Sequence, residues 1–102
     1  MATEVPQPND ELTPKELGCY RSMSQSQRDE IDETIFTHVA DHWKKVAWVA
    51  VQTHEVLESR FPEFSINFYA ERIGYLADRG RLNSKGNVAY MRFSEVRSTR
   101  EG

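Results

Sequence analysis

The residues best suited to chemistry are His38 and His42, which lie four positions apart with Asp41 between them. On one continuous helix the two imidazoles would share a face and could hold a metal ion, with the carboxylate orienting a water. His54, one helix further along, is the nearest candidate for a third ligand. Asp41, however, is typical of a helix N-cap, so we expect the helix to break between the two histidines. We therefore predict no metal site and no bound cofactor.

The remaining nucleophiles also lack the neighbours that catalysis needs. Cys19 is the only cysteine, and no pattern places a histidine beside it to activate the thiol. The serines lack the Gly-x-Ser-x-Gly pattern of an activated nucleophile, and no glycine-rich phosphate loop is present. We therefore predict that the protein is not an enzyme. A single cysteine also fits a reducing compartment, and we expect the cytoplasm.

Length and composition indicate one folded domain. The chain has 102 residues, of which 38% are hydrophobic and 28% charged, values that are ordinary for a globular protein. No apolar run is long enough to span a bilayer, and the first ten residues lack the pattern of a secretory signal, so we expect no membrane contact. The net charge is −3, although residues 63–102 hold seven basic and five acidic residues. That bias falls well short of the basic footprint of a typical nucleic-acid binder.

The N-terminal part predicts a disordered lead over residues 1–11 and a short helix within residues 12–25. Thr13 suits the N-cap and Pro14 suits the first helical position. Glu16, three residues after the cap, can complete a capping box. The helix should run from about Pro14 to Tyr20.

Three apolar residues give this short helix a hydrophobic side: Leu12, Leu17 and Tyr20. The helix could dock on a second copy of the chain and form a homodimer, or it could pack back on its own core. The sequence leaves both alternatives open.

Three further helices are predicted within a domain over residues 26–97. The first begins after Ser26, with Asp29 and Glu30 in its first turn, where negative charge suits the helix dipole. It buries a stripe made by Ile31, Ile35 and Val39, while Arg28, Asp32 and Glu33 face the other way.

Asp41 predicts the N-cap of the next helix, which should run from His42 to about Ser59. This helix is apolar around much of its girth, so we expect it to be the most buried element. Trp43 and Trp48, five positions apart, cannot point the same way. We expect one of them in the core and the other exposed.

Ser65 can cap the last helix, whose inner stripe is Phe68 or Tyr69, Ile73 and Leu76. Gly74 indicates close packing against another backbone, and Gly80 is typical of a left-handed helix end. Beyond it, residues 81–84 and 88–93 predict two strands of a β-hairpin around a turn at 85–87, followed by a flexible tail over residues 98–102. The predicted fold class is mainly α with a C-terminal β-hairpin.

Three helices, a glycine and a hairpin, in that order, resemble the winged helix. The stretch 75–82, followed by Gly86-Asn87 and a strand, is similar to the end of a winged-helix third helix running into its wing. The runs 43–47 and 91–97 also resemble a bacterial domain family that carries only a label for domains of unknown function. The resemblance covers roughly residues 27–97. It implies a winged-helix-like fold with an additional short N-terminal helix, and it supplies no catalytic residues.

Winged helices usually bind DNA, and many bind proteins instead. The exposed positions of the last helix mix both charges, so it should have little attraction for a polyanion. We therefore predict a non-catalytic module that binds a protein partner, such as a small regulator or an immunity-type inhibitor. The alternative is a DNA-binding transcriptional regulator that uses the fourth helix and a basic wing on duplex DNA. The candidate partner-binding residues are Asp29, Asp32, Glu33, Trp48, Asn67, Glu71, Arg72, Arg81, Lys85, Arg92 and Arg97.

Overall fold

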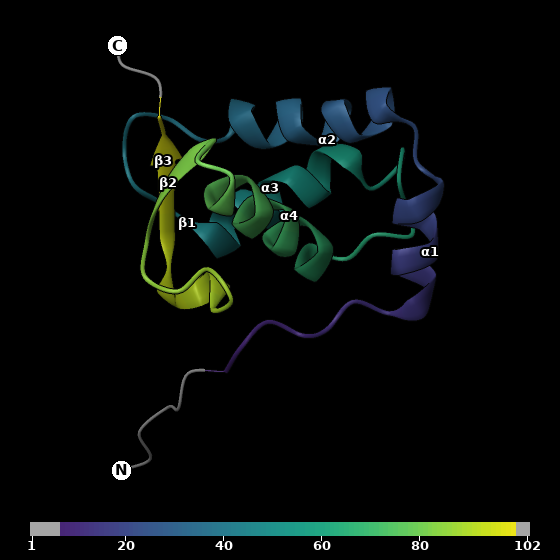
Figure 1. Ribbon diagram of the computed structural model, residues 1–102, viewed down its shortest axis with the longest axis horizontal. Helices are drawn as coiled ribbons and strands as arrows, with labels where there is room; N and C mark the ends of the chain where they lie inside the picture. Colours follow the sequence, from purple (N-terminus) through teal and green to yellow (C-terminus); the bar gives the residue numbers. More distant parts are fainter. Residues whose placement is uncertain (1–6, 100–102) are drawn as a thin grey trace.

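The computed structural model describes residues 7–99 and consists of four helices and a small antiparallel sheet (Figure 1). The elements follow the chain in the order α1 (Pro14–Ser22), α2 (Gln25–Thr37), β1 (Lys44–Lys45), α3 (Val46–Leu57), α4 (Ile66–Asp78), β2 (Leu82–Lys85), the 3₁₀ turn η1 (Met91–Phe93) and β3 (Glu95–Ser98). The prediction of a mainly α chain with a C-terminal β-structure is confirmed. Within the described range, no helix is both long enough and apolar enough to cross a membrane.

One core forms between α2, α3, α4 and the inner face of the sheet. The stripe predicted for the second helix is confirmed, because Ile31, Ile35 and Val39 are all buried. The inner stripe predicted for the last helix is also confirmed, and it includes both Phe68 and Tyr69. The core side chains that are 0% exposed are Ile35, Val46, Val49, Ala50, Tyr69, Ala70, Ile73 and Val96.

The capping box predicted at the start of α1 is confirmed. The Thr13 hydroxyl accepts from the Glu16 backbone N–H at 3.1 Å, and Glu16 Oε1 accepts from the Thr13 N–H at 3.1 Å. The second carboxylate oxygen, Oε2, accepts from the backbone N–H of Ser65 at 3.0 Å and from its hydroxyl at 2.8 Å. One buried carboxylate therefore joins the beginning of α1 to the beginning of α4.

The predicted start of the second helix is wrong. α2 begins at Gln25, because Ser24 and Gln27 form a second capping box. Asp29 and Glu30 consequently lie beyond the first turn, and they do not provide the dipole stabilisation that the sequence suggested.

The predicted start of the third helix is also wrong. The helix breaks between the two histidines as expected, but residues 41–42 form a bend and Lys44–Lys45 form strand β1 before α3 begins at Val46. Strand β1 pairs with β3, Lys44 opposite Val96 and Lys45 opposite Glu95. This pairing satisfies the backbone groups along one edge of β3. A helix that started at His42 would have left that edge unpaired.

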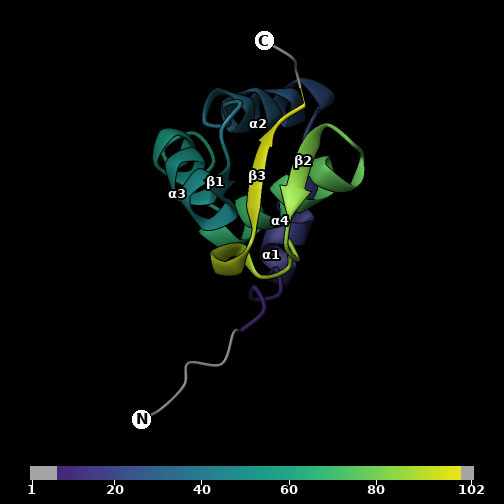
Figure 2. The ribbon, with the colours of Figure 1, turned by 90° about the vertical axis from the view of Figure 1, so that its left-hand side faces the viewer.

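The sheet has three strands in the order β1-β3-β2, and Figure 2 looks onto it with the helices behind. The first strand of the predicted hairpin is confirmed as β2, but the second was placed too early, since β3 spans Glu95–Ser98. The stretch before it forms a turn followed by η1 instead of a strand, and the N-terminal segment binds part of its backbone. Asn9 donates from its N–H to the Ala89 carbonyl at 2.7 Å, and its Oδ1 accepts from the Met91 N–H at 2.8 Å.

Two glycines are explained by the chain around them. Gly80 adopts φ +73°, the left-handed conformation predicted for the end of α4. Gly74 packs against a side chain rather than another backbone, since a Cβ there would lie 3.2 Å from Val88 Cγ2. Residues 1–6 of the predicted lead and residues 100–102 of the predicted tail lie outside the described part of the chain.

Glu16→Gln tests the carboxylate that joins α1 and α4. Burial alone would raise the pKa of Glu16, but the hydrogen bonds from Ser65 and Thr13 outweigh it and hold the pKa below the ordinary value of 4.5. The substituted side chain would turn an amide N–H₂ toward N–H or O–H donors, so we expect the free energy of unfolding at pH 7 to fall by about 1–3 kcal/mol.

Because the folded-state pKa is lowered, this contribution is present above about pH 4.5 and is lost as the pH falls through the folded pKa. Urea unfolding should therefore show a difference between wild type and Glu16→Gln that shrinks at acidic pH. Glu71→Gln, at an exposed position of α4, is the control and should unfold like the wild type. A Glu16→Gln variant as stable as wild type at pH 7 would show that the carboxylate does not join the helices.

Candidate functional site

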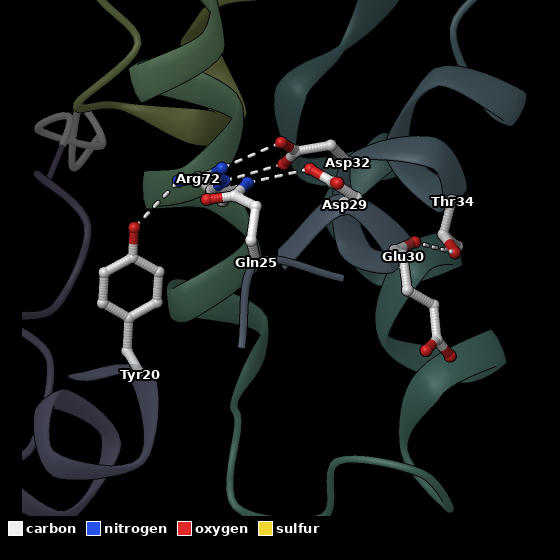
Figure 3. A network of polar contacts seen from close by, with 7 residues as sticks. All are labelled: Tyr20, Gln25, Asp29, Glu30, Asp32, Thr34 and Arg72. Atoms are coloured by element: carbon white, nitrogen blue, oxygen red, sulfur yellow. Dashed lines mark hydrogen bonds and ion pairs between the residues drawn. The ribbon is translucent and has the colours of Figure 1, made fainter. Parts of the chain in front are cut away.

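Two of the predicted partner-binding residues form an internal ion pair. Arg72 of α4 binds Asp32 of α2 through two parallel hydrogen bonds, Nε to Oδ1 at 2.7 Å and Nη2 to Oδ2 at 2.8 Å (Figure 3). The third nitrogen, Nη1, donates to the Tyr20 hydroxyl of α1 at 3.0 Å. The side chains of Arg72 and Asp32 are only 10% and 8% exposed. The guanidinium therefore joins three helices.

Aromatic rings enclose the same guanidinium. Its carbon lies 4.5 Å from the ring centre of Tyr75 and 5.9 Å from that of Tyr20. The hydrogen bond to Asp32 raises the pKa of Arg72 above its already high ordinary value, so the pair stays charged. An ion pair in such surroundings requires both partners, because either one alone would be an uncompensated buried charge. The prediction that Asp32 faces solvent is wrong, and Arg72 is not available as an external contact.

The short N-terminal helix packs on its own core. Leu12 and Tyr20 are partly buried against the core cluster, and Arg28 of α2 donates to the Tyr20 carbonyl at 3.1 Å. Leu17 remains 37% exposed. Of the two alternatives that the sequence left open, packing back on the core is the one observed. A homodimer through α1 stays a prediction.

Four acidic residues lie close together in the sequence of α2, namely Asp29, Glu30, Asp32 and Glu33, and two of them are held by basic side chains. Asp32 is buried in the ion pair, and Glu30 is held by Arg60 of the α3–α4 connection at 2.6 Å. Asp29 and Glu33 remain exposed, and Asp29 accepts a hydrogen bond from Gln25 at 2.9 Å. The carboxylates of this group that stay exposed are therefore Asp29 and Glu33, which are neighbours one helical turn apart on α2.

The outward face of α4 carries a slight excess of negative charge. With Arg72 turned inward, the charged residues left exposed on the helix and its C-cap are Glu71, Asp78 and Arg79. Arg79 lies against the Tyr75 ring at 4.8 Å. Asn67, the remaining candidate on this helix, accepts a hydrogen bond from the Asp10 N–H at 3.3 Å.

The N-terminal segment runs past the loop at residues 86–94 and the beginning of α4, and it hydrogen-bonds to both. Asn9 bonds to the loop backbone at three points, including its side-chain amide to the Val88 carbonyl at 3.3 Å, and Asp10 bonds to Asn67. A ligand that approached α4 and this loop together would meet the chain's own segment first.

The basic residues near the C-terminus are exposed, and three of them rest on aromatic rings. Lys85 and Arg97 lie 5.1 and 4.7 Å from the ring of Trp43, on the outer face of the sheet. Arg81 lies 5.0 Å from the Phe36 ring. Arg92 is exposed on η1. Trp43 is therefore half-buried under cations and is not the core tryptophan that the sequence predicted.

Helix α3 is apolar around its girth, yet one side of it is open. Its outward residues, which we call the α3 outer face, are Trp48, Val51, Gln52, Glu55 and Val56. Trp48 is 44% exposed and Val56 is 56% exposed. The expectation that this helix would be the most buried element is wrong, since α4 buries six residues and α3 five. The expectation of one exposed tryptophan is confirmed. The Lys44 ammonium lies 5.1 Å from the Trp48 ring at one end of the face.

The histidines do not converge. His38 hydrogen-bonds the Thr34 carbonyl through Nδ1 at 2.9 Å, His42 is exposed beside Asp41, and His54 lies 3.7 Å from Glu58. Across residues 7–99, no group of three or more His, Cys, Asp and Glu residues is placed to hold a metal ion. Cys19 is partly buried and packs against the core.

Sequence reasoning missed two residues that shape these surfaces. Asn9 lies in a polar lead without periodic pattern, so no local signal points to its contacts with the loop at 86–94. Lys44 was assigned to a helix rather than to the strand that leads into α3. Glu55 is the only acidic residue of α3 and the helix has no lysine or arginine, so no charged stripe indicates which side of it is open. Comparisons with family models, curated proteins and solved structures find no match for this chain.

Asp32→Ala tests whether the ion pair is internal. It would leave the Arg72 guanidinium buried without a counter-charge, so we expect a loss of about 3 kcal/mol or more in the free energy of unfolding, measured in urea. Glu33→Ala, at the exposed neighbouring position, should change it by less than about 0.5 kcal/mol. Equal small effects of the two substitutions would place Asp32 and Arg72 on the surface.

Proposed function

We propose that the chain is a non-catalytic module with a winged-helix-like arrangement that acts by binding a protein partner. The order α2-β1-α3-α4-β2-β3 supports the arrangement, with α1 as the additional helix and residues 86–94 as the wing. The sheet order β1-β3-β2 also agrees with this arrangement. The short strand β1 directly precedes α3 and pairs with β3, the strand that follows the wing. We place the module in the cytoplasm, for which the single free Cys19 is the support.

The charge on α4 argues against DNA as the partner. A helix that reads duplex DNA presents basic side chains to phosphates and base edges. Here Arg72 is bound to Asp32, and Glu71 and Asp78 face outward. The segment at Asn9 and Asp10 also hydrogen-bonds to the wing and to the beginning of this helix, and it covers part of both. A polyanion would therefore meet repulsion and an obstacle on the face that a DNA-binding winged helix normally uses.

The open side of α3 is the observation that carries the proposal. A helix that is apolar around its whole girth is ordinarily enclosed by protein. The α3 outer face leaves Trp48 and Val56 about half exposed, and Phe93 of η1 is 50% exposed. Exposed tryptophan is also the side chain most often found at the energetic centre of protein interfaces. A protein surface that covers this face would remove that apolar area from water.

A photoreactive phenylalanine analogue at position 48, introduced into the full chain in its native host, tests this function. We expect irradiation to yield a defined protein adduct at position 48. The same analogue at position 83, which is exposed on the sheet, should yield none. Absence of an adduct at position 48, or equal labelling at both positions, would contradict a protein partner at this face.

The alternative of a DNA-binding regulator rests on the exposed basic residues of the sheet and wing. Fluorescence anisotropy with a labelled duplex at about 50 mM salt tests it, since phosphate contacts are strongest there. We expect no salt-sensitive binding, and no difference when Lys85 and Arg92 are both replaced by alanine. Binding that weakens steeply with salt and is lost in Lys85→Ala/Arg92→Ala would reverse the ranking of partners.

A further inference from the structure

We propose that the α3 outer face binds a second copy of this chain, with the two α3 helices antiparallel about a two-fold axis. This inference rests on the proposed function, because it names the protein that covers the face. It differs from a homodimer through α1, whose apolar residues are largely used on the chain's own core.

The spacing of the face suits its own two-fold image. Trp48, Val51, Gln52 and Glu55 occupy positions i, i+3, i+4 and i+7, which lie on one side of a helix. The set is symmetric about the middle of the Val51–Gln52 pair. An antiparallel copy centred there brings Trp48 of each chain opposite Glu55 of the other, with Val51 and Gln52 at the axis. Symmetric dimers require such a self-complementary patch.

The charges of the face are complementary to themselves in the same arrangement. The Lys44 ammonium lies over the Trp48 ring, 5.1 Å from its centre, so the positive charge sits level with position 48. Glu55 is exposed seven residues further along the helix. In the antiparallel pair, Glu55 of one copy therefore approaches Lys44 of the other, and this contact occurs twice.

The helix dipole gives an independent reason for a second copy. Lys44 and Lys45 directly precede the N-terminus of α3, which has no side-chain cap, and Glu55 and Glu58 lie at its C-terminal end. Both charge types stand at the end of the helix that disfavours them. An antiparallel copy supplies carboxylates near the N-terminus and ammonium groups near the C-terminus. These charges therefore destabilise α3 in a single chain and stabilise the antiparallel pair of helices.

The size of the face sets the expected strength. A helix of 12 residues is about 18 Å long, so one helix pair buries less than the ~800 Å² per partner of a standard interface. We therefore expect a dissociation constant in the micromolar range rather than the nanomolar range.

Sedimentation of the full chain from about 1 to about 500 µM tests the inference, a range that spans micromolar affinity. We expect a reversible monomer–dimer equilibrium in the wild type. Lys44→Glu and Glu55→Lys should each weaken it at least about tenfold, because like charges then meet twice in each dimer. Both substitutions place the charge that the dipole of α3 favours, so neither should lower the unfolding temperature.

An equimolar mixture of the two variants is the decisive experiment. In a Lys44→Glu/Glu55→Lys heterodimer both contacts again join opposite charges, so an equimolar mixture should regain the wild-type affinity. Isotope labelling of one variant lets native mass spectrometry identify the mixed dimer. Glu71→Lys, a charge change on α4 away from the face, should dimerise like the wild type.

A wild type that stays monomeric up to about 500 µM, or a mixture that fails to associate, would overturn the second copy as the occupant. If the crosslinker at position 48 then captures a different protein, the proposed function stands and this inference alone fails. If it captures nothing, both fail.

Discussion

The buried ion pair between Arg72 and Asp32 is the interaction on which the rest of the structure depends. It connects α4 to α2 through two parallel hydrogen bonds, and the remaining guanidinium nitrogen reaches Tyr20 of α1. A charge that is 10% exposed cannot be left without its partner. The positions of the three helices are therefore fixed together, and Glu16 adds a second tie between α1 and α4.

The same ion pair decides which surfaces are left for binding. With Arg72 turned inward, α4 lacks the cation that would give it a basic face, and the Asn9 segment hydrogen-bonds to the loop at residues 86–94. α1 uses most of its apolar side on the core. The outer side of α3 remains exposed, and this helix is mostly apolar. Lysines lie near its N-terminus and glutamates near its C-terminus, the placement that the helix dipole disfavours. The protein thus leaves one side of its least polar helix exposed.

The features predictable from sequence are those set by neighbours in the chain. The capping box at Thr13 and Glu16, the apolar stripe of α2 and the left-handed Gly80 follow from local chemistry, and all are present. Features that depend on distant partners were missed. Asp32 lies outside the apolar stripe, and only a partner 40 residues away makes it internal. Strand β1 exists because β3 offers an edge, which no local pattern of the two lysines can indicate.

The most direct test of this account is the nitrogen–proton NMR spectrum of the arginine side chains. A guanidinium held by Asp32 and Tyr20 should give one Nε–H signal that assigns to Arg72, exchanges slowly with water at neutral pH and persists in high salt. The signal should disappear into fast exchange in Asp32→Ala. An Arg72 Nε–H that exchanges as fast as those of Arg79 and Arg92 would show that α4 presents this cation to solvent, and it would contradict the account.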